Sequence, residues 1–143
     1  MTINEIQDEI IEEFSLFDDW MDKYNYLIEL SKDLPKIDEK DKTEENLING
    51  CQSSVWLKAE WRDGVIHFTA DSDAIITKGI IALLVRVLSD RTPQEILHAD
   101  LYFIDQIGLK ENLSPTRSNG LVAMVNQIKL YAMAYNHKMN EQK

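Results

Sequence analysis

The stretch LKAEWRDGVIHFTA, residues 57–70, decides the fold class, because two alternating runs flank a two-residue turn. Asp63 followed by Gly64 is typical of a tight β-hairpin turn. Counting outward from this turn places six apolar residues on one face as three opposing pairs: Trp61 with Ile66, Ala59 with Phe68, and Leu57 with Ala70. The other face pairs Lys58 with Thr69 and Glu60 with His67. We expect this face to be exposed to solvent. His67 is then a surface partner of Glu60 rather than a catalytic base.

Helical patterns flank the hairpin on both sides. Residues 3–17 and 20–28 carry apolar residues at helical spacing, and Thr2 with Glu5 forms a capping box. The run from Ala74 to Ser89 is apolar nearly all round, which predicts a central buried helix capped by Asp71 and Asp73. A capping box at 92–95, a short element around 102–107 and the pair Ser114-Pro115 predict three further helical starts. The order predicts an α+β fold, a small antiparallel sheet packed against helices, as one domain over residues 1–143.

The composition excludes several function classes. The formal net charge of −10 argues against binding to nucleic-acid phosphates or to anionic lipid. One cysteine rules out an intramolecular disulfide and a multi-thiolate metal site, and we expect no metal and no cofactor. No apolar run is fit to cross a bilayer and no secretory signal is recognisable, so we expect a cytoplasmic protein. Residues 36–45 mix charges of both signs and predict a solvated loop.

The single cysteine, Cys51, stands in an unusual place for a packing residue. It follows Asn49-Gly50, a dipeptide that turns the chain, just before the strand expected to begin near Ser54. Gly50 can adopt positive φ and has no side chain, which would let another molecule's backbone approach the sulfur. We therefore expect an exposed thiol in a loop, and an exposed thiol is a liability unless the sulfur is used.

Two kinds of residue could activate this thiol. None of the three histidines, His67, His98 and His137, lies in a recognisable catalytic setting, so a cysteine hydrolase is weakly supported. Arg117 falls in the first turn of the last helix, where the helix dipole disfavours a cation. That conflict points equally to two interpretations: an ordinary exposed arginine, or one that pairs with a partner's carboxylate or steadies an anionic sulfur.

Three blocks of the sequence together resemble the SufE family, which includes the related CsdE proteins. They are NGCQSSVW at 49–56, ADSDAIITKGIIALL at 70–84 and LSPTRSNGL at 113–121, in the family's order and at similar separations. The likeness spans nearly the whole chain. It implies a fold similar to that of the U-type iron–sulfur scaffold proteins.

The resemblance also implies a function in iron–sulfur cluster assembly. Family members accept sulfur from a pyridoxal-phosphate-dependent cysteine desulfurase of the SufS or CsdA kind, stimulate it, and pass the sulfur to a scaffold complex. By this likeness Cys51 is the sulfur-accepting residue. Arg117 matches an arginine of the desulfurase-facing region, Asp73 lies in a neighbouring region, and Gly50 and Gln52 flank the thiol in the same contact.

Other functions stay open at this point. An iron–sulfur scaffold needs several thiolates in one subunit, and the chain has one. A binding module could regulate a desulfurase without carrying sulfur. The particular desulfurase, the downstream acceptor and the oligomeric state, a homodimer included, are not fixed by the sequence.

Overall fold

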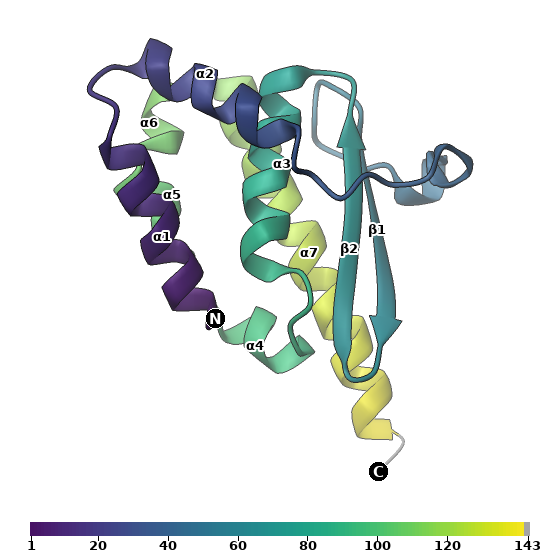
Figure 1. Ribbon diagram of the computed structural model, residues 1–143. Helices are drawn as coiled ribbons and strands as arrows, with labels where there is room; N and C mark the ends of the chain where they lie inside the picture. The colour runs from purple at the N-terminus through teal and green to yellow at the C-terminus, as the bar shows by residue number, and fades with distance from the viewer. Residues whose placement is uncertain (142–143) are drawn as a thin grey trace.

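The structure is a computed structural model that describes residues 1–141. It has seven α-helices, two short 3-10 turns and one hairpin within these residues (Figure 1). The elements are α1 (Ile3–Ser15), α2 (Trp20–Ser31), the 3-10 turns Glu39–Asp41 and Glu44–Asn46, β1 (Val55–Arg62), β2 (Val65–Ser72), α3 (Ile75–Leu88), α4 (Pro93–His98), α5 (Phe103–Gln106), α6 (Leu109–Asn112) and α7 (Pro115–Glu141). The α+β class with a small antiparallel sheet is confirmed. The domain limit at residue 143 lies outside the described residues and stays a prediction.

The hairpin has the predicted register. Trp61 pairs with Ile66, Ala59 with Phe68 and Leu57 with Ala70, in an antiparallel two-stranded sheet. Four of these six side chains are fully buried, whereas Trp61 at the turn end is 40% exposed and stacks on Tyr135 of α7. The alternation of the two strands was therefore enough to choose the buried face, because a slip by one residue would have exposed it.

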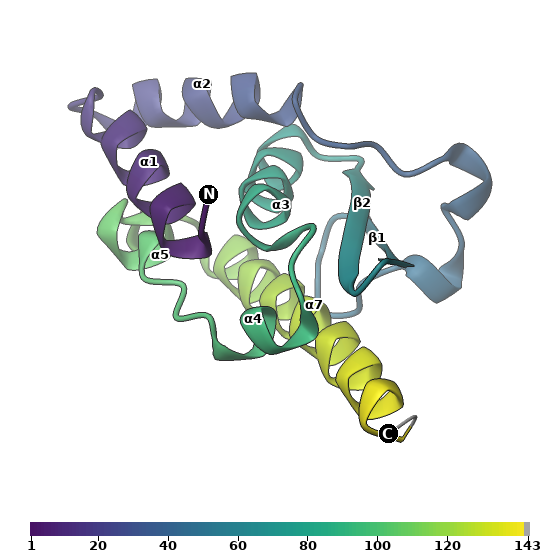
Figure 2. The same ribbon diagram turned by 60° about the horizontal axis from the view of Figure 1, so that its bottom comes forward.

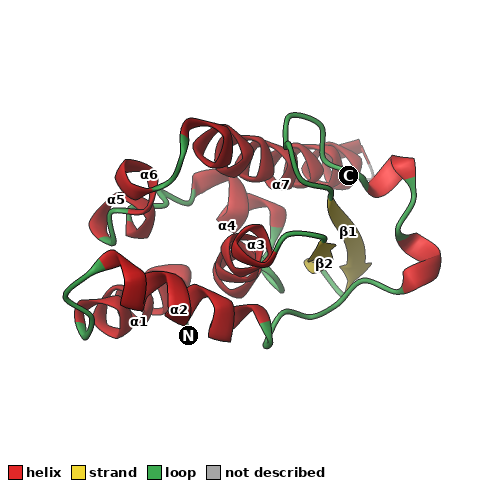
Figure 3. Ribbon diagram, turned by 90° about the horizontal axis from the view of Figure 1, so that it is seen from above, coloured by secondary structure: helices red, strands yellow, loops and turns green. Residues whose placement is uncertain are grey.

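Helix α3 is the central buried helix that the sequence predicts. Ten of its residues are buried: Thr77, Gly79, Ile80, Ile81, Ala82, Leu83, Leu84, Val85, Val87 and Leu88. Seen from above, it lies between α2 on one side and α7 on the other, with the hairpin next to it (Figure 3). Because α3 is buried along most of its length, it holds the remaining elements in their relative places.

The predicted cap of α3 is wrong. Ala74 is the N-cap, and no side chain caps it. Asp71 lies in β2 instead, where it forms ion pairs with Lys42 at 2.8 Å and Lys78 at 3.3 Å. Burial raises the pKa of this carboxyl, but hydrogen bonds from Lys42, the Ser72 N–H and Lys78 outweigh burial and hold the pKa below its usual range.

The other predicted helix starts are confirmed. Thr2 and Thr92 each accept a hydrogen bond in a complete capping box, with Glu5 and Glu95 as the reciprocal residues. At the start of α7, the Ser114 hydroxyl accepts a hydrogen bond from the Arg117 N–H at 3.3 Å. The described residues contain no helix long and apolar enough to span a bilayer.

The charged segment at residues 36–45 is largely exposed to solvent, as predicted, but it is also fastened to the hairpin by several contacts. Residues 32–54 pass around the outer side of the hairpin (Figures 2 and 3). The Asp41 carboxylate pairs with Lys58 of β1 at 2.9 Å, and Lys42 lies over the Trp56 ring. Ile37 within it is buried. The segment also forms isolated bridges to the sheet, from Lys36 to Ala70 and from Leu47 to Trp56.

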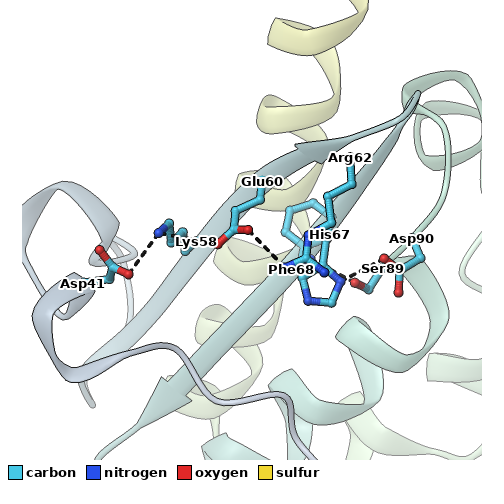
Figure 4. Close-up of polar contacts among 8 residues, drawn as sticks. All are labelled: Asp41, Lys58, Glu60, Arg62, His67, Phe68, Ser89 and Asp90. Atoms are coloured by element: carbon cyan, nitrogen blue, oxygen red, sulfur yellow. Dashed lines mark hydrogen bonds and ion pairs between the residues drawn. The ribbon is translucent and has the colours of Figure 1, made fainter.

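His67 has a different partner from the one predicted. Its Nδ1 lies 2.8 Å from an Asp90 oxygen, beyond the end of α3 (Figure 4). Glu60, directly opposite His67 in the register, pairs with Arg62 and Lys58 instead. Register alone could not identify this partner, because Asp90 approaches from a turn outside the hairpin.

A glycine lets α2 and α3 approach closely, and it supplies a test of the fold. A Cβ on Gly79 would lie 2.5 Å from the Leu27 carbonyl oxygen, which is backbone and cannot turn away. In contrast, a Cβ on Gly120 of α7 would meet only Cys51, at 3.5 Å or more. The two glycines thus offer a matched pair of helical Gly→Ala substitutions.

We predict that Gly79→Ala lowers the free energy of unfolding by about 1–3 kcal/mol, because overpacking outweighs the better helix propensity of alanine. Gly120→Ala should leave it unchanged or raise it by up to about 1 kcal/mol. Urea denaturation of both variants measures the difference. Equal stability of the two variants would contradict the close α2–α3 contact.

Candidate functional site

Cys51 lies in a loop that rests against the first turns of α7. The loop is held on its strand side by the Ile48 N–H, which donates to the Val55 carbonyl at 2.8 Å. The Cys51 thiol donates to the Gly120 carbonyl, with the sulfur 3.7 Å from the oxygen. The residue is half-buried. The prediction of a loop cysteine is confirmed, but the prediction of an exposed thiol is wrong, because α7 covers one side of it.

This environment favours the protonated thiol. Burial raises the pKa of Cys51 above its ordinary value. A carbonyl oxygen can accept a hydrogen bond from S–H but repels a thiolate, so the contact with Gly120 acts in the same direction. The nucleophilic form is the thiolate, and the site therefore holds Cys51 in its less reactive state.

Gly50 has the positive φ that the turn was expected to need, at 95°. The space left by its missing side chain is already occupied from within the chain. A Cβ built on Gly50 would lie 3.3 Å from the Ala123 Cβ on α7, which is tighter than ordinary contact. The absence of a side chain at Gly50 therefore lets the Cys51 loop pack closely against α7. The sequence-based expectation was that it would let another molecule approach the sulfur.

A pocket of about 350 Å³ adjoins Cys51. Its walls come from three parts of the chain: the Cys51 loop, the first half of α3 and the first turns of α7. The lining residues are Cys51, Gln52, Ser53, Thr77, Ile80, Ser114, Thr116, Arg117, Gly120 and Met124. Cys51 and Arg117, which are far apart in sequence, thus line one pocket. Its inner side chains Thr77, Ile80 and Met124 are buried, and Gln52 and Arg117 are exposed at its edge.

Asp73 is placed outside the pocket lining, at the end of the same loop. Its carboxylate accepts a hydrogen bond from the Ser54 N–H at 3.0 Å, and its own N–H donates to the Ser54 carbonyl at 3.2 Å. The Ser72 hydroxyl donates to that carbonyl as well, at 2.8 Å. The residue predicted as a helix cap therefore ties the Cys51 loop to the end of β2, while remaining exposed.

The described pocket lining contains no histidine. His67 is engaged with Asp90, and His98 of α4 contacts the Gln94 carbonyl through its Nδ1 at 2.8 Å. His137 is exposed near the end of α7 and has a partner within the chain. A Cys–His pair at Cys51, which a cysteine hydrolase would need, is not formed among residues 1–141.

Sequence reasoning missed seven residues of the pocket lining: Ser53, Thr77, Ile80, Ser114, Thr116, Gly120 and Met124. Thr77 and Ile80 were included only as part of a buried helix. Gly120 gave a detectable signal, because glycine is disfavoured inside a helix and needs a reason there. Its contact with Cys51 spans 69 positions, which no local pattern can predict.

Comparison with known proteins places the chain in a family. Residues 8–132 match the family model described as SufE, Fe-S metabolism associated domain. An uncharacterized SufE-like protein of Rhizobium etli is 42% identical over 127 residues, which cover 85% of this chain and 86% of that protein. An uncharacterized SufE-like protein of Rhizobium meliloti is 40% identical over 127 residues, covering 85% and 91%.

A solved structure shares the fold. It is the solution structure of a hypothetical protein from Thermus thermophilus, with a TM-score of 0.73 over 90% of this chain and 94% of that one. The identity is 20%, so this likeness speaks for the fold alone. The family match and the two relatives together carry the assignment: the chain belongs to the SufE family, whose domain is associated with Fe–S metabolism.

Proposed function

We propose that this protein accepts sulfur from a cysteine desulfurase onto Cys51, stimulates that enzyme, and delivers the sulfur to a scaffold complex for iron–sulfur clusters. The observation that best supports the proposal is the position of Cys51 in a pocket with Arg117 at its edge. Membership of the SufE family supports the association with Fe–S metabolism. The desulfurase, of the SufS or CsdA kind, supplies the pyridoxal phosphate.

The transfer step is a thiol–disulfide exchange. The Cys51 thiol loses its proton, and the thiolate attacks the outer sulfur of the persulfide on the desulfurase cysteine. The bond between that outer sulfur and the desulfurase sulfur breaks, and the desulfurase cysteine leaves as a thiolate. The step is redox-neutral, since one S–S bond forms as another breaks.

The lone cysteine suits a carrier. A second thiol close to a persulfide attacks its inner sulfur and releases sulfide, which ends the transfer. The chain has one cysteine in 143 residues, so no other thiol of the same chain can intercept the sulfur. The same count weighs against the role of a cluster scaffold with several thiolate ligands from one subunit.

The residues around the pocket support a docking role. Arg117 is exposed and forms no ion pair with the described side chains of residues 1–139, so its charge is available to a carboxylate on the desulfurase. Gln52 is exposed beside the thiol. Gly50 and Asp73 shape the loop that presents Cys51, through the close contact with Ala123 and the hydrogen bond to Ser54. We assign these four residues to the desulfurase contact.

Docking must also produce the thiolate. The raised pKa and the Gly120 contact keep the thiol protonated in the free protein. A partner that moves the sulfur away from the carbonyl, or places a positive charge beside it, would lower this pKa and start the transfer. The acceptor would then react mainly when it is bound to its donor.

We predict that wild-type protein incubated with desulfurase and cysteine gains the mass of one sulfur atom, and that Cys51→Ser gains none. Intact-protein mass spectrometry after anaerobic desalting measures both. Sulfur on Cys51→Ser, or its absence from wild type, would refute the proposal. The same variant tests the alternative of a regulator that carries no sulfur, which requires full stimulation of the desulfurase by Cys51→Ser.

We predict that Arg117→Ala binds the desulfurase about tenfold more weakly, since loss of one charge-assisted contact costs about 1.5 kcal/mol or more. Its thermal unfolding should match wild type, because Arg117 is exposed and makes no ion pair with the described side chains of residues 1–139. Titration calorimetry measures the affinity. Lys110→Ala, an exposed cation on α6 outside the pocket, is the matched control. Equal affinity of Arg117→Ala and wild type would remove Arg117 from the contact.

We predict that the alkylation rate of Cys51 in the free protein rises with pH to a midpoint above that of the urea-unfolded chain. The reason is that burial raises the pKa of the folded thiol, whereas the unfolded thiol has an ordinary pKa. Iodoacetamide labelling over a pH series gives both midpoints. A folded midpoint at or below the unfolded one would contradict the assignment of a protected, protonated thiol.

A further inference from the structure

Gly120 is a buried glycine inside α7, and the fold does not require it. A Cβ on Gly79 would strike the backbone of α2, which explains that glycine by packing. Gly50, Gly64 and Gly108 have positive φ, whereas Gly120 lies within a continuous helix, where alanine is favoured. Gly120 therefore needs a local reason.

The only neighbour that a side chain at Gly120 would meet within 4 Å, among the described residues, is Cys51. An alanine Cβ there would lie 3.5 Å from the Cys51 Sγ and 4.0 Å from its Cβ. Both are ordinary contacts, so a plain thiol at Cys51 is compatible with alanine at position 120. The methyl would stand beside the sulfur, and Gly120 belongs to the lining of the pocket next to Cys51.

A persulfide needs more room than a thiol on this side. Its outer sulfur lies about 2.05 Å from Sγ, the length of an S–S bond. Because this bond spans more than half of the 3.5 Å between Sγ and an alanine methyl, an outer sulfur turned toward α7 beside that methyl would lie inside contact distance of it. Alanine at 120 thus permits Cys51–SH and excludes the conformers of Cys51–SSH that point to α7.

We propose that Gly120 is the residue that makes room for the second sulfur, so that a persulfide on Cys51 can fold back against α7 inside the pocket. This inference rests on the proposed function. With glycine, the outer sulfur lies beside the buried side chains Ile80 and Met124 that line the same pocket. With alanine, the outer sulfur is directed away from α7 and toward solvent, where reductants reach it.

The test uses Gly120→Ala and loads the thiol without any desulfurase. Inorganic polysulfide is the donor: the Cys51 thiolate attacks a terminal sulfur, the S–S bond next to it breaks, and a polysulfide shorter by one sulfur leaves. After desalting, dithiothreitol is added, and mass spectrometry follows the fraction of chains that still carry the extra sulfur. Asn119→Ala, an exposed neighbour on α7 outside the pocket lining, is the matched control.

We expect the persulfide of Gly120→Ala to be lost several-fold faster than that of wild type or Asn119→Ala. We also expect all three proteins to alkylate equally fast as free thiols with iodoacetamide. A structural disturbance of the loop would change the free-thiol rate as well, so an altered rate would overturn the proposal. Equal persulfide lifetimes in wild type and Gly120→Ala, or failure of Gly120→Ala to fold, would also overturn it.

The outcome is separable from that of the proposed function. If wild type takes sulfur from the desulfurase and Gly120→Ala keeps its persulfide as long as wild type, the carrier function stands and the role of Gly120 falls. If wild type takes no sulfur from the desulfurase but holds polysulfide-derived sulfur in a manner that depends on Gly120, the carrier function falls and the steric role stands.

Discussion

The burial of α3 along most of its length is the constraint on which the rest of this structure depends. A helix that is apolar nearly all round must be covered on every side, and no single neighbour can do this. Helices α1 and α2, the hairpin and α7 each cover part of it. The contact with α2 is close enough that Gly79 has no room for a side chain. The N-terminal half of α3, with α7 beside it, then forms the inner wall of the Cys51 pocket.

The site inherits its chemistry from this arrangement. Cys51 is carried by a loop between a charged segment and a strand, and the loop rests on α7, which already packs against α3. Burial of the Cys51 sulfur shields it from solvent but also lowers its reactivity as a nucleophile. The contact that half-buries the sulfur also keeps its proton on. In the proposed carrier role this arrangement would be useful, since a thiol that is less reactive in the free protein would become more reactive where a partner rearranges the loop.

The sequence predicted the features that depend on near neighbours. The hairpin register followed from Asp63-Gly64 and the alternation beside it, and the capping boxes at Thr2 and Thr92 followed from spacing three residues apart. Predictions failed where a side chain had partners from a distant element. Asp71 was predicted to cap α3 but forms an ion pair with Lys42 instead. His67 was predicted to pair with Glu60 but pairs with Asp90. Cys51 looked exposed because its cover, α7, lies near the other end of the chain. The resemblance of three separated blocks to one family identified Arg117 as a second site residue besides Cys51. The structure then added Gly120, which lines the same pocket.

The isolated bridges around the hairpin have a consequence for how this acidic protein behaves at high concentration. A two-stranded sheet has two unpaired edges, and open edges recruit strands from other molecules. Here the outer side of β2 is bridged by Lys36 and Arg91, and that of β1 by Leu47. Three short stretches of ordinary backbone thereby interrupt both edges where an incoming chain would have to bond. We therefore expect the bridges formed by Lys36, Leu47 and Arg91 to reduce edge-to-edge aggregation of the hairpin.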